Sequence, residues 1–275
     1  MMLDYHLLAV LAGTLLATGL AAGLLAGLLG VGGGIVMVPI LYFVFGAVGV
    51  DDAVRMHLSV GTSLGAMIPT SIRSALAHYR KGAVDVELFR RWLPGIGLGV
   101  LVGVLTAARV KGPVLMTVFA LFATAVALHM AFGKEGWRVA SRLPGRAGQT
   151  AMAAVISAVS VMMGIGGGTF TVPVLTLFGY PIHRAVGTAA AIGVLIAVPG
   201  AVGFILGGLG EAGRPPGSFG YANLIGVAAL IPTTILAAPW GAALAHRLDR
   251  VWLRRAFALF LGATGLKMAL SLIGG

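Results

Sequence analysis

Two glycine-rich runs, each surrounded by apolar residues, carry the chemistry most readily inferred from this sequence. Gly30-Val31-Gly32-Gly33-Gly34 precedes Ile35 to Pro39, and Gly164-Ile165-Gly166-Gly167-Gly168 precedes Thr169 to Pro173. Such clusters break a helix, since each Gly costs about 1 kcal/mol relative to Ala. A helix that restarts after the break presents free N–H groups, which attract anions. We therefore predict an anionic substrate at the backbone of six glycines: Gly32, Gly33, Gly34, Gly166, Gly167 and Gly168.

Hydroxyl side chains lie close to both runs and would add donors to such a site. Together with amides they replace part of an oxyanion's hydration without the tight grip of several arginines. The alternative is helix packing, because Ser and Thr are common where helices touch in bilayers. The candidates are Ser59, Thr62, Ser63, Thr169, Thr171 and Thr188. Of these, we predict Thr62, Ser63, Thr169 and Thr188 as substrate-binding residues.

Few ionisable side chains lie inside the apolar sequence. His57 and His183 each stand four residues before a glycine, Gly61 and Gly187, and are candidates for gating or proton relay, or for helix capping. Arg73 lies within an apolar segment, where it would counter the substrate's charge or extend to the interface. All eight acids fall in loops or at segment ends. Because cation transporters place acids within the membrane, this pattern favours an anion.

Other kinds of chemistry are poorly supported. Gly61 to Gly65 matches G-x-S-x-G, which would make Ser63 a hydrolase nucleophile, but that elbow needs a preceding strand, an acid and a base. The corresponding residue of the second half is Ala189, not serine. We therefore predict no enzyme, no catalytic residue, no cofactor and no metal. The net charge of +11 is attributed to basic membrane-flanking loops and not to nucleic-acid binding.

The elements that would position these residues are membrane helices. Hydrophobic residues make up 59% of the chain, charged residues 10%, and mean hydropathy is +1.01, whereas soluble domains are about 25% charged. Long apolar stretches predict an all-α polytopic membrane protein. We expect ten segments, at about 7–29, 35–49, 55–77, 91–108, 113–132, 148–165, 169–179, 184–207, 219–246 and 251–273.

The two halves of the chain repeat each other. Their glycine runs align, and so do their histidines, prolines and arginines: Pro94, Gly103 and Arg109 correspond to Pro232, Gly241 and Arg247. We predict a first repeat at 1–133, a basic cytoplasmic linker at 134–147 and a second repeat at 148–275. Five segments per repeat place the second copy upside down in the membrane.

Charge and segment length refine this topology. Basic residues crowd onto one side, which the positive-inside rule makes cytoplasmic, so that both termini are expected to be periplasmic. As helices, segments 35–49 and 169–179 would span about 22 Å and 16 Å, short of the ~30 Å hydrocarbon core. Half-helices at matching places in inverted repeats indicate a binding site near the midplane. Length does not decide whether they cross or re-enter.

Regular glycine spacing predicts close helix contacts elsewhere. Glycines recur every four residues in two segments, which is the small-residue pattern that lets membrane helices approach closely. They are Gly19, Gly23 and Gly27, and Gly95, Gly99 and Gly103.

These motifs resemble those of the TauE/SafE family of sulfite exporter-like permeases. The likeness rests on G-V-G-G-G-x-x-x-V-P at 30–39, G-I-G-G-G-x-x-x-V-P at 164–173 and A-V-G-T-A-A at 185–190, and it covers essentially the whole chain. It implies transport of sulfite or organosulfonates across a bacterial inner membrane. We predict a secondary transporter that alternates access around the two glycine runs. The alternatives are an anion channel, a carrier of another small organic anion and a membrane scaffold; proton coupling and homodimer formation stay open.

Overall fold

The polypeptide is described by a computed structural model over residues 5–29, 33–132, 138–245 and 250–273. Within these ranges it forms ten helices and one short hairpin. The first five helices are α1 (Tyr5–Leu29), α2 (Gly34–Ala47), α3 (Asp52–Arg80), α4 (Val86–Ala107) and α5 (Gly112–Phe132). The next five are α6 (Arg146–Met162), α7 (Gly168–Leu177), α8 (Ile182–Gly207), α9 (Leu224–Ala245) and α10 (Arg250–Ile273).

The helices confirm the expected all-α membrane architecture. In the described chain, four helical stretches are long and apolar enough to cross a bilayer: α4, α5, α8 and residues 224–241 of α9. One detail differs from the expected segment 219–246, because its first residues form strands β1 (Ser218–Phe219) and β2 (Ala222–Asn223). Gly220 has φ 57° at the first position of the two-residue loop, a conformation that glycine adopts without steric cost.

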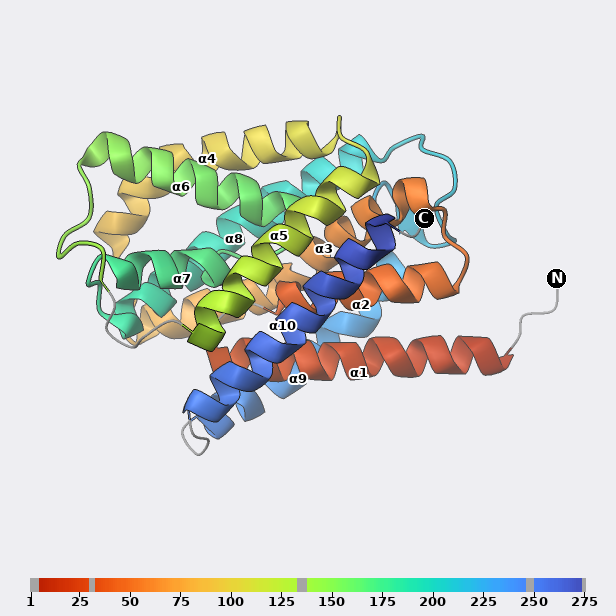
Figure 1. Cartoon of the computed structure of the whole chain (residues 1–275), viewed down its shortest axis with the longest axis horizontal. Coiled ribbons are helices and arrows are strands. Elements are labelled where there is room, and N and C mark those ends of the chain that lie inside the picture. The colour runs from red at the N-terminus through yellow and green to blue at the C-terminus, as the bar shows by residue number, and fades with distance from the viewer. Residues whose placement is uncertain (1–4, 30–32, 133–137, 246–249, 274–275) are drawn as a thin grey trace.

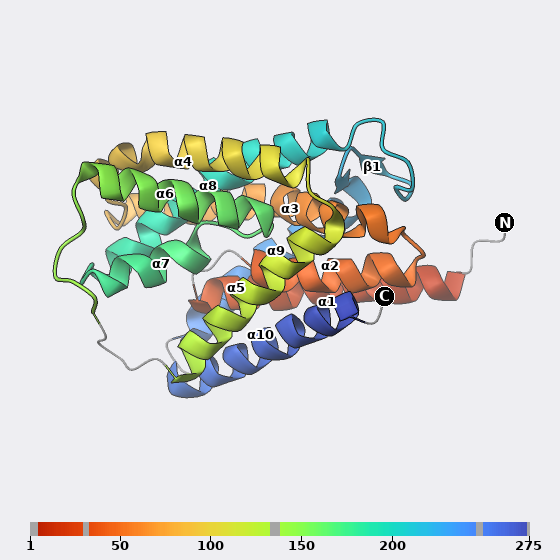
Figure 2. The same ribbon diagram turned by 45° about the horizontal axis from the view of Figure 1, so that its top comes forward.

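Helices from the two halves of the chain pack against each other in a regular pattern. α1 lies along α9, α4 along α6, α3 along α8 and α5 along α10 (Figures 1 and 2). If each helix is replaced by its counterpart in the other half, five positions away, the pair α1–α9 becomes α6–α4 and the reverse. The pairs α3–α8 and α5–α10 map onto themselves. Two equivalent five-helix halves related by a two-fold axis would give this pattern.

The two short helices fold back on their predecessors. Figure 1 shows α2 returning toward the end of the bundle where α1 begins, and α7 returning toward the end where α6 begins. Their 14 and 10 residues correspond to about 21 Å and 15 Å of helix. Each has the course of a re-entrant segment, and the two enter the bundle from opposite ends.

Close helix approach occurs at the regularly spaced glycines, as predicted. A Cβ atom placed on Gly99 of α4 would lie 2.1 Å from the carbonyl oxygen of Ala154 on α6. One placed on Gly23 of α1 would lie 2.5 Å from that of Thr234 on α9. Any side chain at Gly99 or Gly23 would push the paired backbones apart. Gly27, the remaining glycine of the α1 series, lies among residues whose packing is not described.

Candidate functional site

The glycine break before α2, of which the structure describes Gly33 and Gly34, meets the second break, residues 164–168, inside the bundle. A Cβ atom placed on Gly34 would lie 2.6 Å from the carbonyl oxygen of Gly164 and 3.1 Å from the Cα of Ile165. Both glycines are buried. The breaks are therefore in backbone contact although 130 residues separate them in sequence, and a ligand at one lies beside the other.

The first break leads into α2 through a left-handed residue. Gly33 has φ 73° and ψ −17°, and its carbonyl oxygen accepts the amides of Val36 and Met37 at 3.0 Å and 3.2 Å. The amides of Gly34 and Ile35 precede these first helical hydrogen bonds, as expected of a helix N-terminus. This end of α2 carries the positive pole of the helix dipole. Gly32 lies outside the described residues.

The second break combines a helix end with a helix start. Gly164 has φ 66°, its amide donates to the Val161 carbonyl, and Ile165 donates to Ser160 at 2.9 Å. This is a Schellman motif, in which a left-handed glycine closes a helix. α7 then begins at Gly168, and Thr171 donates its amide to Gly167 at 3.0 Å. The non-helical stretch between α6 and α7 includes Gly166 and Gly167.

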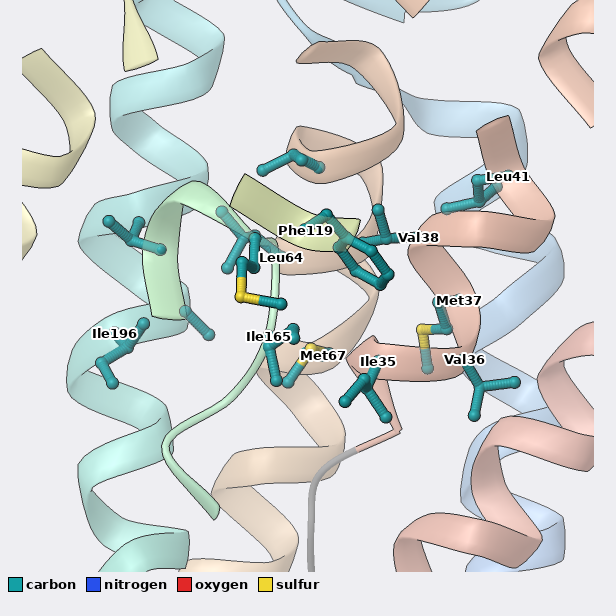
Figure 3. Packing of buried hydrophobic residues seen from close by; sticks show 14 of the residues in the cluster. Ile35, Val36, Met37, Val38, Leu41, Leu64, Met67, Phe119, Ile165 and Ile196 are labelled. Carbon is teal, nitrogen blue, oxygen red and sulfur yellow. The ribbon is translucent and has the colours of Figure 1, made fainter. Parts of the chain in front are cut away.

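Two side chains of α3 occupy the space between the breaks. The Ser63 hydroxyl donates to the Gly164 carbonyl at 2.9 Å and is fully buried. Met67, one turn further along α3, lies between Ile35 and Ile165 in Figure 3. A Cβ atom placed on Gly34 would lie 2.5 Å from Met67 Sδ, and one placed on Gly166 would lie 2.5 Å from Met67 Cε. α3 therefore contacts both breaks, and a flexible thioether fills the space where they meet.

Further donors line the second break. A Cβ atom placed on Gly193 of α8 would lie 3.5 Å from the amide nitrogen of Gly167 and 3.7 Å from Ser71 Oγ of α3. Thr169 and Thr171 of α7 are both buried, and Thr171 Oγ1 has no hydrogen-bond partner among the described residues. A buried hydroxyl without a partner is costly, so it marks a place where a ligand or water would be bound.

The hydroxyls of Ser157 and Ser160 on α6, like that of Thr171, have no hydrogen-bond partner among the described residues. Both serines are fully buried. Ser160 also supplies a carbonyl to the Schellman motif, which places it directly beside the second break. Sequence reasoning missed Ser71, Ser157 and Ser160, although a hydroxyl one to two turns before a glycine break is a signal that could have found the last two.

The interior near the breaks is uncharged. The buried residues that the structure describes include no Asp, Glu, Lys or Arg. Arg73, predicted as a counter-charge, is exposed on α3 and is not among the buried side chains at the breaks. Any anion held here would interact with amides and hydroxyls and not with a fixed cation.

Thr62 and Thr188 have equivalent structural partners. Thr62 Oγ1 accepts the amide of Asn223, and Thr188 Oγ1 accepts the amide of Asp85, both at 2.9 Å. Asn223 and Asp85 immediately precede α9 and α4, and each accepts an amide three residues further on. Both threonines therefore anchor the N-terminus of a long helix that belongs to the other half of the chain.

The glycine before each threonine makes this anchoring possible. A Cβ atom on Gly61 would lie 2.1 Å from the carbonyl oxygen of Tyr221, and one on Gly187 would lie 2.5 Å from that of Ala83. The repeated Gly-Thr pair is thus a docking site for a loop. Sequence reasoning missed the loops themselves, whose shared pattern is Gly82-Ala-Val-Asp85 and Gly220-Tyr-Ala-Asn223.

One of these loops carries an ionic cluster. The Tyr180 hydroxyl donates to the Asp85 carboxylate, and Arg184 Nη2 lies 3.1 Å from Asp85 Oδ2. Burial alone would raise the pKa of Asp85, but hydrogen bonds from the Leu88 amide and Tyr180, together with Arg184, hold it below its usual value. Burial and the neighbouring carboxylate raise the pKa of Tyr180. Asp85 is therefore ionised in this cluster.

The repeated histidines occupy different environments. His57 is buried, with Nε2 3.0 Å from the Ala107 carbonyl oxygen and 3.2 Å from that of Val110. His183 is exposed at the start of α8. The structure brings neither ring to the glycine breaks, and only His57 is enclosed by protein.

Comparison with known proteins identifies relatives over nearly the whole chain. The family model described as "Sulfite exporter TauE/SafE" matches residues 15–268. A "probable membrane transporter protein" of Haemophilus influenzae is 32% identical over 246 residues, which cover 88% of this chain and 91% of that protein. Proteins with the same description from Methanocaldococcus jannaschii and Bacillus subtilis are each 26% identical, over 88% and 80% of this chain and 89% and 84% of their own lengths. No solved structure matches.

Proposed function

This chain belongs to the sulfite exporter TauE/SafE family, and we propose that it is a secondary transporter of small sulfur-containing oxyanions such as sulfite or an organosulfonate. That it is a membrane transporter and not an enzyme follows from the family and from the descriptions of its relatives. The substrate class and the site are our inference. The observation that carries them is the backbone contact between two buried glycine breaks, each leading into a helix N-terminus.

The available donors suit a sulfonate or sulfite head group. Such a head presents several oxygens that accept hydrogen bonds, and the breaks offer the early amides of α2 and α7 with the hydroxyl of Thr171. Neutral donors and helix dipoles stabilise an anion without trapping it as buried arginines would. Reversible binding is what a carrier needs. Met67 would have to move aside for the ligand, and an unbranched thioether does so at little cost.

The packing supports alternating access. α1–α2 and α6–α7 enter the bundle from opposite ends, so that rocking one half against the other would open the breaks to each side in turn (Figure 1). We place the chain in the bacterial inner membrane. The end that carries Arg80, Lys81, Arg90, Arg91, Arg138, Arg142, Arg146 and Arg184 is cytoplasmic under the positive-inside rule, and both termini are periplasmic.

Gly193→Ala is the most direct test of the site. The added methyl group would lie at ordinary contact distance from its neighbours, yet beside the Gly167 amide and Ser71 Oγ, where we place the substrate. In proteoliposomes that take up radiolabelled isethionate, we expect uptake to fall about tenfold, with an unchanged melting temperature. Gly262→Ala is the matched control, because its methyl group would meet only Ala127 Cβ, at 3.8 Å. Equal uptake by the two variants would refute the proposed site.

The same vesicles distinguish a carrier from a channel and a sulfonate from another anion. A carrier exchanges internal for external substrate, so unlabelled isethionate inside should accelerate uptake of the labelled compound; a channel should not show this. Sulfite, alkyl sulfonates and carboxylates of equal size can be compared by thermal stabilisation of the purified protein, since a ligand that binds the folded form raises its stability. Preferential stabilisation by carboxylates would contradict the proposed substrate class.

A further inference from the structure

His57 is held by hydrogen bonds that determine which ring nitrogen is protonated. Its Nε2 faces two carbonyl oxygens, those of Ala107 and Val110, at 3.0 Å and 3.2 Å. Carbonyl oxygens only accept, so Nε2 must carry a proton in the neutral ring. Nδ1 then bears the lone pair. It is buried and has no hydrogen-bond partner among the described residues.

A small cavity adjoins the ring. It is lined by His57, Ala107, Gly203, Phe204 and Tyr221, among others, and has a volume of ≈ 10 Å³. This volume is close to the ~10–15 Å³ that one water molecule needs. The Tyr221 ring stacks on the imidazole with centroids 4.9 Å apart and planes inclined by 27°. The imidazole is thus rigidly placed beside a space that admits water but no larger ligand.

We propose that His57 Nδ1 is a proton-binding site coupled to anion movement, an inference that rests on the transporter function proposed above. The proton is taken from water at this end of the bundle and held as Nδ1–H. The ring gains one positive charge while its Nε2–H bonds stay in place. The two carbonyls belong to the last turn of α4 and the turn after it, and a helix C-terminus favours a cation. A water in the cavity would accept the new N–H bond.

The charged groups around His57 come from three elements. The connection between α8 and α9 contributes the Glu211 carboxylate, whose field reaches the ring. α3 itself contributes Arg55, which is engaged by Asp52 at 2.6 Å and by the Val50 carbonyl. The remaining groups are Arg214 near Tyr221, and the exposed Arg109 and Lys111, which flank Val110. Burial of the ring opposes its charging, Glu211 favours it, and the nearby cations are at the surface or already paired.

His57 shares a helix with the residues between the glycine breaks. Ser63 lies six residues further along α3, about 9 Å by helical rise. A charge that appears on the ring acts on the contact of α3 with α4 and the α8–α9 hairpin, and a shift of α3 would move Ser63 and Met67 against the breaks. His183, the equivalent residue in the other half, is exposed and has no such enclosure. Only one of the two repeated histidines is therefore assigned a proton.

The first experiment measures the protonation itself. In purified full-length protein labelled with 15N in its imidazoles, one ring should show the Nε2–H tautomer at about pH 8 and gain Nδ1–H on acidification to about pH 5. This signal should be absent from His57→Gln and present in His183→Gln. A His57 ring that carries its neutral-state proton on Nδ1, or that stays neutral over this range, would overturn the inference. This outcome does not depend on which anion is transported.

The second experiment measures coupling. In proteoliposomes with an imposed pH gradient, isethionate uptake by the wild type should rise several-fold over uptake without a gradient, since its sulfonate stays ionised throughout. His57→Gln should lose this acceleration and keep isethionate exchange, whereas His183→Gln should behave as the wild type. Persistence of the acceleration in His57→Gln, or its equal loss in both variants, would refute coupling at His57. If no protein moves isethionate, the proposed substrate class fails, and the nitrogen titration still decides the proton site.

Discussion

The two glycine breaks have the same motif but lead into chemically different half-helices. After the first break, α2 begins with Ile35 and Met37, whereas α7 has Thr169 and Thr171 at the equivalent positions. All four side chains are buried. A shared backbone design is therefore combined with an apolar surface in one half and hydroxyls in the other. The comparison teaches that the repeat conserves the break itself, and that side-chain donors for an anion come from the second half.

The backbone conformations differ as well. Gly33 takes the left-handed conformation immediately before α2, whereas in the second break the left-handed residue is Gly164, four residues before α7 begins. The described non-helical backbone of the second break includes Gly166 and Gly167. We infer that the substrate's charged head faces the second break and that the first break packs against it.

Gly34→Ala should have the largest effect on the protein, because it strikes the contact between the breaks. The new Cβ atom would lie 2.6 Å from the Gly164 carbonyl oxygen and 3.1 Å from Ile165 Cα, and neither backbone atom can move independently. Overpacking of this kind costs about 1–3 kcal/mol. We expect a clearly lower melting temperature and loss of isethionate uptake in proteoliposomes.

Gly166→Ala is the matched substitution in the second break. Its Cβ atom would meet only the terminal methyl group of Met67, which can rotate away. We expect the melting temperature to stay within a few degrees of wild type while uptake declines, because the displaced thioether narrows the site. If Gly34→Ala is as stable as Gly166→Ala, the breaks are not in contact as described.

Thr171→Val tests whether hydroxyls of the second half bind the substrate. Removing a buried hydroxyl that has no partner removes a desolvation cost, so stability should be unchanged or slightly higher. If this hydroxyl donates to the anion, uptake at low substrate concentration should fall about tenfold. Thermal melting and initial uptake rates measure the two effects separately.

Thr234→Val is the control, since Thr234 is equally buried but already donates to the Leu230 carbonyl at 2.7 Å. This variant should lose a little stability and keep its transport rate. Normal uptake by Thr171→Val would show that the difference between the two half-helices is only a difference in packing.

Much of the fold was predictable because bilayer physics leaves few choices. Apolar length located the helices. The glycine runs at 30–34 and 164–168 marked the interruptions, because glycine destabilises a helix more than any residue except proline. The spacing of Gly95, Gly99 and Gly103 predicted a close contact, and the structure supplies α6 as the partner. Which helices meet was not predictable, because pairing depends on contacts between residues far apart in sequence.

The site was less predictable for the same reason. Thr62 and Thr188 were identified as important from their repetition, but the loops whose Asn223 and Asp85 amides donate to them are defined only in three dimensions. The exposed position of Arg73 and the unequal burial of His57 and His183 likewise depend on which face of a helix is covered. Repetition in sequence indicates a shared backbone role, and it does not ensure that the two copies share an environment.

The smallest expected effect concerns the charge that distinguishes the two docked loops. Asp85 is ionised and paired with Arg184, whereas the equivalent Asn223 is neutral. The pKa of Asp85 in the folded protein lies below its ordinary value of 3.8, so its stabilisation is complete above that value and is lost as pH falls through the folded pKa. Because the Arg184 side chain is 53% exposed, we expect Asp85→Asn to cost less than about 1 kcal/mol at neutral pH.

Thermal melting from about pH 7 down to about pH 3 measures this difference between the halves. The wild type should lose more stability than Asp85→Asn at the acid end, so the two melting curves should converge as Asp85 becomes protonated. Asn223→Asp provides the reciprocal test, since the new carboxylate keeps its capping oxygen but has no Arg184 to pair with in the other half. If the difference in melting temperature between wild type and Asp85→Asn stays constant with pH, the charge at Asp85 adds nothing to the stability of the fold. The two loops would then be anchored alone by the hydrogen bonds that their Asp85 and Asn223 amides donate to Thr188 and Thr62.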